Sequence, residues 1–542
     1  MSTQDLLIEL GTEELPPKAL LQLSEAFTQG VVAGLAEHRL QHGNVQSYAS
    51  PRRLAVVFEN LQSQAEDQAV EALGPPADRA KDEEGNWSKA AVGFAKKHGI
   101  DPDTLEIAET EKGPRLRYSS IAAGATVEDC LQGIIETSVG KLPIPKRMRW
   151  GAGRTEFVRP AHWAVVLFGT SVLPCTILGH SAGRTTQGHR FHSTGEIEIA
   201  EPADYRETLR QAHVIADYAE RQNLIKEQVE AEAAQLNATA VLDQDLLDEV
   251  TGLVEWPVAL TGKFEKSFLQ VPAEALVYSM KEHQKYFPVV DQQGQLLPNF
   301  ITVSNIESSD PQQVVSGNER VIRPRLSDAD FFFTTDKKTP LADRVDKLKD
   351  IVFQKKLGTL HDKTIRVAGL AQNIAEKTGA DSNLAERAAL LSKTDLLTEM
   401  VGEFADMQGI AGRYYALHDG EDASVAHALE QQYWPRQSGA QLPEGPVATS
   451  LALADRLDTL VGIFGIGQSP SGSKDPFALR RASLGVLRIL VEGELDLDLR
   501  ECLTMAAQQY TANIIEEDTV EKVLSYMIDR FRAWYEDEQI AV

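Results

Sequence analysis

The sequence predicts a multidomain α+β protein, with a mixed α/β N-terminal body followed by an all-helical domain. The chain has 542 residues, which is too long for one hydrophobic core, so three or four domains are expected. Strand-like and helix-like segments alternate in the first part of the chain, whereas residues 341–491 show helical periodicity almost throughout. This contrast places the main change of architecture near residue 340.

The N-terminal body is expected to span residues 1–142. DLLIEL is an apolar run typical of a strand, and a helix from about Lys18 to Leu40 follows it, with apolar residues at every third or fourth position. VQSYAS and RRLAVVFENL predict strands on either side of a Ser-Pro turn, and RLRYSSIAAG predicts another. The polar stretch 74–90 contains two prolines and is expected to be a loop. Thr126 is the expected N-cap of the helix TVEDCLQGIIETSVGKL.

Residues 143–340 are expected to form a β-rich body that also contains one long helix. The strand-like runs are WAVVLFG, VLPCTILG, EIEIA, WPVALTGKF and FITVSNI. The charged stretch AHVIADYAERQNLIKEQVEAEAAQL predicts the helix. Residues 341–491 form the helical domain, and residues 492–542 are expected to begin a further helical region that includes VEKVLSYMIDRFRAWYEDE.

The composition is that of a globular protein with an acidic surface. The chain carries 80 acidic and 54 basic residues, a formal net charge of −26, and such a field repels a polyanion at long range. Binding of a nucleic acid would therefore need local basic patches or the charge of a partner. No run of 18 apolar residues predicts a membrane span. The cysteines Cys130, Cys175 and Cys502 are odd in number and far apart, which favours a reducing compartment, the cytoplasm.

One part of the helical domain is patterned like a metal-dependent phosphohydrolase of the HD superfamily. HDKTIRVAGLA begins at His361, and LALADRLDTL contains Asp455, as the first and last ligands of such a centre would require. The central His-Asp pair is missing, because Ser392 and Lys393 follow the apolar run instead. A protonated lysine cannot bind a metal, and Asp395 would face about 200° around a helix from Lys393. We therefore expect no metal, and a vestigial centre at these positions; an active phosphohydrolase is kept as an alternative.

The densest basic cluster is IPKRMRWG, in which cations stand beside an aromatic residue. Basic and aromatic side chains together can hold phosphate groups and stack on bases. The candidates are Lys146, Arg147, Arg149 and Trp150.

A second candidate begins in the loop GIGQSPSGSK. The loop does not match a phosphate-binding P-loop, because Ser473 precedes Lys474 and no buried strand leads into it. Asp475 can cap the following helix, FALRRASLGVLRILV. Arg481 and Arg488 are seven residues apart, which places both side chains on one face of this helix. The candidate phosphate contacts here are Lys474, Arg480, Arg481 and Arg488.

Other chemistry finds little support. His189 and His192 in GHRFH are spaced as a metal pair, but no third ligand stands out, so a structural or RNA-contacting role is expected. Neither the His-Ile-Gly-His loop of class I aminoacyl-adenylating enzymes nor the arginine-ended ATP motif of class II is present. The sequence therefore predicts no catalytic residue on this chain.

Several long stretches, in order, carry a resemblance that covers nearly the whole chain. They include LLIELGTEELPPKAL, SPRRLAV, KLPIPKRMRWG, RTTQGHRFH, EWPVALTGKF, VPAEALVYSMKEHQKYFPV, GNERVIRPRLSDADFFF, LGTLHDKTIRVAGLA, SKTDLLTEMVGEFADMQGIAGRYYA and IFGIGQSPSGSKDPFALRRA. The chain resembles the β subunits of bacterial heterotetrameric glycyl-tRNA synthetases.

The resemblance implies a division of labour between two subunits. ATP, Mg²⁺ and glycine bind to a separate α subunit, this chain binds no cofactor, and the subunits form an α2β2 tetramer. The β subunit binds glycine tRNA, and its helical domain is a degenerate HD-like domain. Family members usually continue into a helical anticodon-binding domain, which is not expected in a sequence that ends at Val542. A scaffold subunit without RNA contact remains a second alternative.

Overall fold

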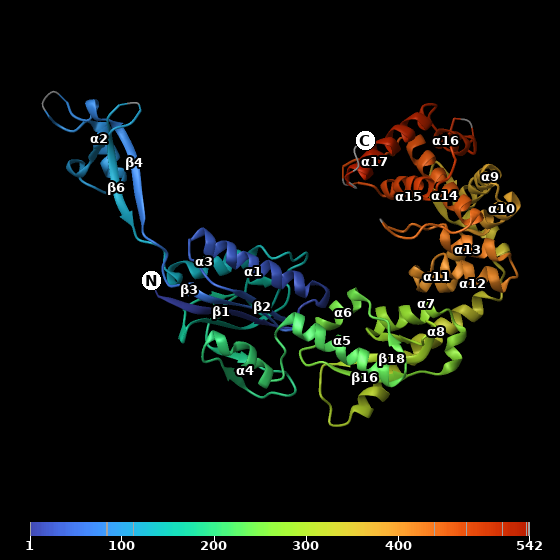
Figure 1. Cartoon of the computed structure of the whole chain (residues 1–542), viewed down its shortest axis with the longest axis horizontal. Coiled ribbons are helices and arrows are strands. Elements are labelled where there is room, and N and C mark those ends of the chain that lie inside the picture. Colours follow the sequence, from blue (N-terminus) through green and yellow to red (C-terminus); the bar gives the residue numbers. More distant parts are fainter. Residues whose placement is uncertain are drawn as a thin grey trace. The chain divides into compact units, whose positions relative to one another are not determined.

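The computed structural model describes residues 2–82, 85–111, 113–437, 439–472, 474–511, 513–537 and 539. Ser473 and Val542, both used above, lie outside these ranges. Two compact units emerge: an N-terminal unit (1–262, 285–292 and 301–315) and a C-terminal unit (263–284, 293–300 and 316–542). Small sheets and a helical C-terminal region confirm the multidomain α+β class (Figure 1). The four domain boundaries predicted from the sequence stay predictions.

A five-stranded antiparallel sheet organises the N-terminal unit. Its order is β10 (Ser171–Val172), β9 (Ala161–Phe168), β1 (Thr3–Thr12), β3 (Arg53–Gln62) and β2 (Val45–Ser50). β1 lies in the middle because its apolar run can be buried on both faces. The strands predicted at DLLIEL, VQSYAS, RRLAVVFENL and WAVVLFG are confirmed.

Helices cover both faces of this sheet (Figure 1). The covering helices are α1 (Leu20–Glu37), α3 (Val127–Gly140) and α4 (Tyr205–Gln211). Leu6, Ile8 and Leu10 of β1 share a core with α1 and α3, whereas Leu7 belongs to the core that contains α4. This alternation follows from the two-residue period of a strand. Thr126 Oγ1 accepts a hydrogen bond from the Asp129 amide (3.2 Å), so the predicted N-cap of α3 is confirmed.

The chain between β3 and α3 forms a separate small sheet. Its strands are β4 (Gln68–Pro76), β6 (Arg115–Ala122) and β5 (Glu106–Ala108), in that order, with helix α2 (Lys89–Lys97). The loop predicted for 74–90 is wrong at its start, because β4 continues through the Gly-Pro-Pro segment by pairing Pro76 with Arg115.

The rest of the N-terminal unit contains short strands and two helices. The long helix is α5 (Tyr218–Gln235), which starts after the N-cap Asp217 and is shorter than predicted. Helix α6 spans Gln244–Thr251. The short strands are β7 (Met148–Arg149), β8 (Glu156–Phe157), β11 (Thr176–Ile177), β12 (His180–Ser181), β13 (Thr185–Gln187) and β14 (Glu196–Glu198). A further sheet has the order β15 (Thr239–Ala240), β17 (Phe287–Val290), β18 (Leu296–Ser304) and β16 (Val258–Lys263).

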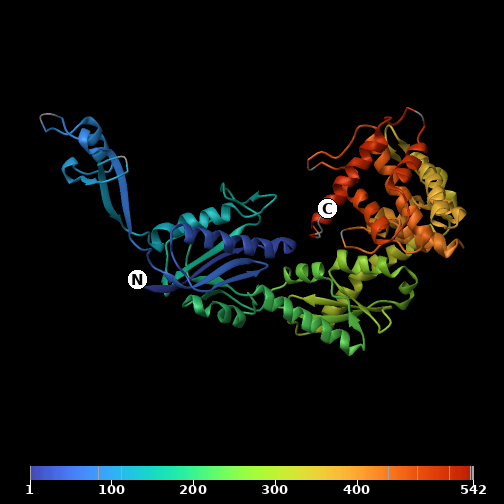
Figure 2. The ribbon, with the colours of Figure 1, turned by 45° about the horizontal axis from the view of Figure 1, so that its top comes forward.

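The C-terminal unit is built almost wholly of helices (Figures 1 and 2). They are α7 (Ala273–Tyr278), α8 (Pro311–Asp336, from residue 316), α9 (Leu360–Thr378), α10 (Ser382–Leu391), α11 (Glu399–Glu403), α12 (Ile410–His418), α13 (Ala423–Gln431), α14 (Pro446–Gly465), α15 (Leu479–Glu492), α16 (Leu499–Gln508) and α17 (Thr519–Asp537). Helix α14 packs against α9, α10, α13 and α15, and its residues are buried on nearly every side. A hairpin of β19 (Val352–Gln354) and β20 (Gly358–Thr359) interrupts the predicted helical stretch.

A buried ionic network joins distant segments of the N-terminal unit. Arg53 is fully buried, and its guanidinium lies 3.5 Å from Glu9 and 3.4 Å from Glu255. Arg53 also donates hydrogen bonds to Thr186 Oγ1 (3.1 Å) and to the Gln187 carbonyl (2.7 Å). The network therefore connects β1, β3 and β13 through one side chain.

Replacing Arg53 by methionine should destabilise the N-terminal unit by about 3–5 kcal/mol, because the buried carboxylate of Glu9 loses its counter-charge and that of Glu255 keeps only Arg52. Hydrogen exchange of β1 and β3 amides, compared with the wild type, measures the effect. Arg117→Met is the matched control, since Arg117 pairs with Glu106 on the surface, where an ion pair contributes about 0–1 kcal/mol. Equal effects of the two substitutions would contradict a stabilising role for the buried network.

Candidate functional site

The vestigial centre predicted at Asp455 lies between α9 and α14. Thr359 and Asp362 form a capping box that starts α9, and three- and four-residue spacing then places Lys363 and Arg366 on the face toward α14. Lys363 Nζ lies 3.3 Å from Asp455 Oδ1 and 3.1 Å from Asp458 Oδ2. Arg366 Nε donates to Asp458 Oδ1 (2.7 Å).

Lys393 brings a second ammonium group to the same carboxylate. Helix α10 ends at Leu391, and the Ser392 hydroxyl donates a hydrogen bond to the Ala389 carbonyl (2.7 Å). Lys393 Nζ then lies 3.2 Å from Asp455 Oδ1 and donates to Gln432 Oε1 (2.7 Å). Two ammonium groups therefore share one carboxylate oxygen.

The charge of this centre is balanced by protein groups alone. Burial by itself would raise the pKa of Asp455, but the ammonium groups of Lys363 and Lys393 outweigh it and hold that pKa well below its usual range. Asp395 is buried beyond a short turn, where Oδ2 accepts a hydrogen bond from the Gly409 amide (2.6 Å). Burial raises the pKa of Asp395 to about 6.

A metal ion does not fit this arrangement. Lysine ammonium groups have no lone pair for a metal and repel a cation. His361 stands two residues before Lys363, about 200° around α9, so Lys363 and not His361 faces the carboxylate. Within the described ranges, no group of three or more His, Cys, Asp or Glu side chains is suited to a metal.

Both histidines of GHRFH form hydrogen bonds with backbone groups. His189 is buried; its Nδ1 accepts from the amides of Phe191 (3.2 Å) and His192 (3.3 Å), and its Nε2 lies 2.6 Å from the Asn305 carbonyl. His192 Nε2 accepts from the Glu307 amide (2.9 Å). Burial lowers the pKa of His189, which favours a neutral ring. Both residues fit the predicted structural role.

The basic start of α15 is exposed, but its far end is not. Asp475 accepts hydrogen bonds from the amides of Leu479 (2.8 Å) and Arg480 (3.0 Å), which supports the predicted cap although α15 begins only at Leu479. Lys474 and Arg481 are exposed, and Arg480 donates to the Gly472 carbonyl.

Arg488 differs from these residues although it lies on the same helix. It is buried and holds Glu492 through two hydrogen bonds (2.5 and 2.8 Å). Its ion pair is therefore part of the packing of α15, and it is the weakest of the predicted phosphate contacts.

The IPKRMRWG cluster is only partly free for a ligand. Lys146 is exposed. Arg147 donates to the Gly140 carbonyl at the end of α3 (3.0 Å), and Arg149 pairs with Glu156 across the β7–β8 hairpin (2.5 Å). Trp150 packs against the core of the N-terminal unit. The cluster and the start of α15 belong to different units.

The sequence analysis missed three residues of the vestigial centre: Lys363, Arg366 and Asp458. A local signal exists. Lys363 and Arg366, like Asp455 and Asp458, are spaced i, i+3 within otherwise apolar helical stretches, so each pair falls on one helix face. Opposite charges on two buried helix faces would have indicated an ion-pair network.

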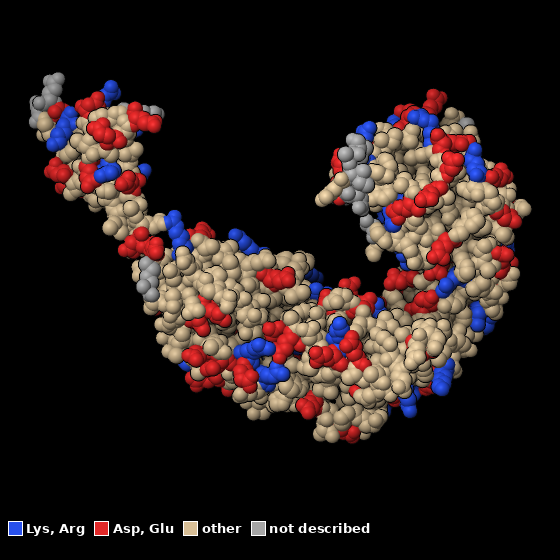
Figure 3. All heavy atoms as spheres, viewed as in Figure 1, with Lys and Arg blue, Asp and Glu red and all other residues tan. Residues whose placement is uncertain are grey.

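Acidic and basic side chains are intermixed on the visible surface. Figure 3 shows Asp and Glu scattered over both units, with Lys and Arg between them. The basic candidates are thus local features of an acidic protein. None of the described helices is long and apolar enough to cross a membrane.

The geometry defines a helical unit in which two buried ammonium groups hold one carboxylate. Comparison with known proteins gives the family. The family model described as "Glycyl-tRNA synthetase beta subunit" matches residues 6–542, and the chain belongs to this family.

Several curated relatives are similar over the whole chain. The glycine–tRNA ligase beta subunit of Marinobacter nauticus is 54% identical over 542 residues, which cover 100% of this chain and 78% of the relative. The one from Hahella chejuensis is 56% identical over 538 residues (99% and 78%), and one from Pseudomonas aeruginosa is 53% identical over 542 residues (100% and 79%).

Replacing Asp455 by asparagine should destabilise the C-terminal unit by about 3–5 kcal/mol at neutral pH, because it leaves the buried ammonium group of Lys393 without a counter-charge and that of Lys363 with Asp458 alone. The folded pKa of Asp455 is depressed, so its stabilising effect is present above the unfolded pKa of about 4 and is lost as the pH falls below that value. Urea unfolding followed at α9 and α14 should therefore show a wild-type advantage that shrinks in acid.

The control for this prediction is Glu501→Gln, which removes an exposed carboxylate of the same unit that pairs with the partly exposed Lys377. It should cost about 0–1 kcal/mol. A difference between Asp455→Asn and wild type that grows in acid would contradict the proposed ion triad.

Proposed function

We propose that this chain is the non-adenylating subunit of a glycine–tRNA ligase. It binds glycine tRNA and orients the acceptor arm for reaction on an α subunit, which binds ATP, Mg²⁺ and glycine, in an α2β2 tetramer. The chain itself supplies no catalytic residue and no cofactor. The buried free cysteines are in keeping with the cytoplasm, which we propose as its location.

The observation that carries the proposal is the contrast between two groups of cations in the C-terminal unit. Lys363 and Lys393 are buried, and both form ion pairs with Asp455. Lys474 and Arg481 are exposed and have no side-chain hydrogen bond or ion pair with any residue that the structure describes. The first group closes a former catalytic centre, and the second is available for the phosphates of an RNA.

Positioning alone is a sufficient contribution to the reaction. Holding two reactants in a productive geometry can supply about 7–11 kcal/mol of the barrier without any reacting group. The net charge of −26 opposes non-specific RNA binding. Exposed cations at a few places would therefore select a particular docking geometry.

The candidate phosphate-binding residues can be ranked by whether their side chains already have protein partners. Lys146, Lys474 and Arg481 can bind a phosphate at once, whereas Arg149 must leave Glu156 and Arg480 must leave the Gly472 carbonyl. Arg147, Trp150 and Arg488 have structural partners, so they rank last. The phosphohydrolase alternative is not favoured, because the ammonium groups stand where metal ligands are required.

Removing Lys474 and Arg481 together, as the double variant Lys474→Ala/Arg481→Ala, should weaken glycine tRNA binding. Each lost phosphate contact should reduce the slope of log K against log salt concentration by about one. Arg500→Ala is the control, since Arg500 is an exposed arginine of α16 that is already paired with Glu521. An unchanged slope in the double variant would favour a scaffold without RNA contact at this surface.

Glycine attachment to tRNA should require both polypeptides. We expect ATP–pyrophosphate exchange with glycine only when the α subunit is present, and efficient charging only when the two are mixed. Assays with this chain alone, the α subunit alone and the mixture give the result. Exchange activity in the purified chain alone would overturn the assignment of adenylation to the other subunit.

A further inference from the structure

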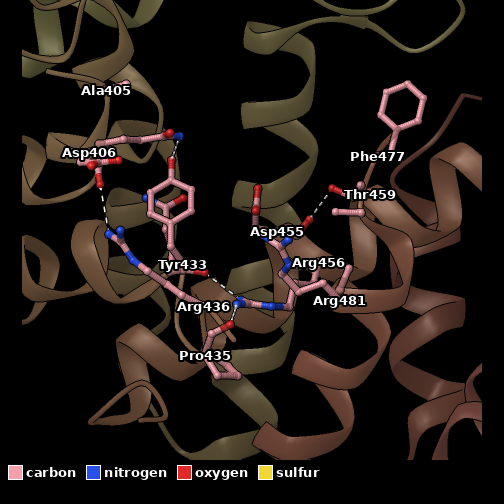
Figure 4. A pocket seen from close by; sticks show the side chains of 14 residues that line it. Ala405, Asp406, Tyr433, Pro435, Arg436, Asp455, Arg456, Thr459, Phe477 and Arg481 are labelled. Atoms are coloured by element: carbon pink, nitrogen blue, oxygen red, sulfur yellow. Dashed lines mark hydrogen bonds between the residues drawn. The ribbon is translucent and has the colours of Figure 1, made fainter. Parts of the chain in front are cut away.

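A cavity of about 420 Å³ opens beside Asp455 in the C-terminal unit. Its lining comes from α14, the first turn of α15, residues 432–436 and the segment around Gln408 (Figure 4). This volume falls within the range of about 300–1,000 Å³ typical of small-molecule sites. The ion triad of Asp455, Lys363 and Lys393 does not account for this cavity. The candidate phosphate contacts Lys474 and Arg481 do not account for it either.

The wall of the cavity is fixed before any ligand binds. Arg456 is buried and donates to the carbonyls of Gln432 (2.7 Å), Ala452 (3.0 Å) and Trp434 (2.7 Å). A Cβ at Gly485 would lie 2.6 Å from Arg456 Nε, so a glycine is needed there for α15 to approach α14. Arg456 is thus a structural clamp, and its donors are not free for a ligand.

The floor and the rim of the cavity differ in charge. Both ammonium groups lie on Oδ1 of Asp455, and the partly exposed Asp455 side chain lines the cavity. At the rim, the cations Arg436 and Arg481 and the carboxylate Asp406 are exposed. Arg436 has only a long 3.4 Å hydrogen bond to the Gln408 carbonyl.

Two aromatic side chains complete the lining. Tyr433 and Phe477 both contribute to the wall, and Figure 4 shows Asp455 between them. The Tyr433 hydroxyl accepts a hydrogen bond from Gln408 Nε2 (2.7 Å), which fixes the ring. A planar ring system in the cavity would find apolar faces to stack against.

We propose that this cavity binds one nucleotide. The floor offers the hydrogen-bond acceptor Asp455 and the rim offers two cations, so the matching ligand has a neutral donor for the floor and an anionic end for the rim. A nucleotide meets both conditions: its phosphate pairs with Arg436 and Arg481, its base stacks on Phe477 or Tyr433, and an amino group or ribose hydroxyl donates to the Asp455 carboxylate.

The nucleotide has two sources with the same chemistry. One is an unpaired nucleotide of bound tRNA, in which case the inference rests on the proposed function; the other is a free nucleotide. Competition between the two ligands separates the sources.

The test uses the full chain and four 5′-mononucleotides, together with 5′-phosphorylated single-stranded trinucleotides, followed by saturation-transfer NMR and equilibrium dialysis. Phe477→Ala and Arg481→Met should each weaken binding about tenfold. Ala482→Phe, which fills the wall of the cavity, should abolish it. The control is Lys377→Met, a partly exposed cation of α9 paired with Glu501, and thermal melting shows which variants are folded.

Displacement of the mononucleotide by glycine tRNA supports the inference with RNA as the source, and lack of displacement supports it with a free nucleotide as the source. Binding that is absent for both probe types, or unaffected by all three cavity substitutions, overturns it. The affinity of glycine tRNA is measured separately, so a failure of the cavity is distinguishable from a failure of the proposed function.

Discussion

The C-terminal unit depends on one carboxylate held between two ammonium groups. Asp455 is carried by α14, the most buried helix of the unit, while its partners come from α9 and from the turn after α10. Ionising Asp455 inside the protein is costly unless opposite charges lie within a few ångströms. Lys363 and Lys393 satisfy that condition at 3.3 and 3.2 Å. The triad therefore ties three segments together.

Local patterns in the sequence predicted much of this unit. The missing His-Asp pair and the position of Asp455 could be predicted from the sequence, because each depends only on the residue type at a given position. Lys363 was missed because the side chain that faces a neighbouring helix depends on the rotation of α9, and His361 is chemically more conspicuous. Arg481 and Arg488 share a helix face by spacing, yet only tertiary packing decides that Arg488 is buried against Glu492.

Strand boundaries were harder to predict than helices for a related reason. The central strand β1 is predictable because its sequence contains a continuous apolar run. In contrast, β4 enters a Gly-Pro-Pro segment that signals a loop, and only the pairing of Pro76 with Arg115 keeps it in the sheet. Long-range pairing of this kind leaves little trace in local composition. The buried network around Arg53 likewise depends on contacts between distant segments that no local pattern predicts.

The shared oxygen of Asp455 also makes a metal centre difficult to build at this position. Exchanging Lys393 for a ligand-bearing residue leaves the ammonium of Lys363 3.3 Å from the same oxygen, where it still excludes a divalent ion. Exchanging Lys363 first leaves Lys393 in the same position at 3.2 Å. A metal site here would need both lysines to be replaced together, with intermediates that weaken the interior. Divalent-metal chemistry at this position is therefore excluded by the same contacts that stabilise the fold.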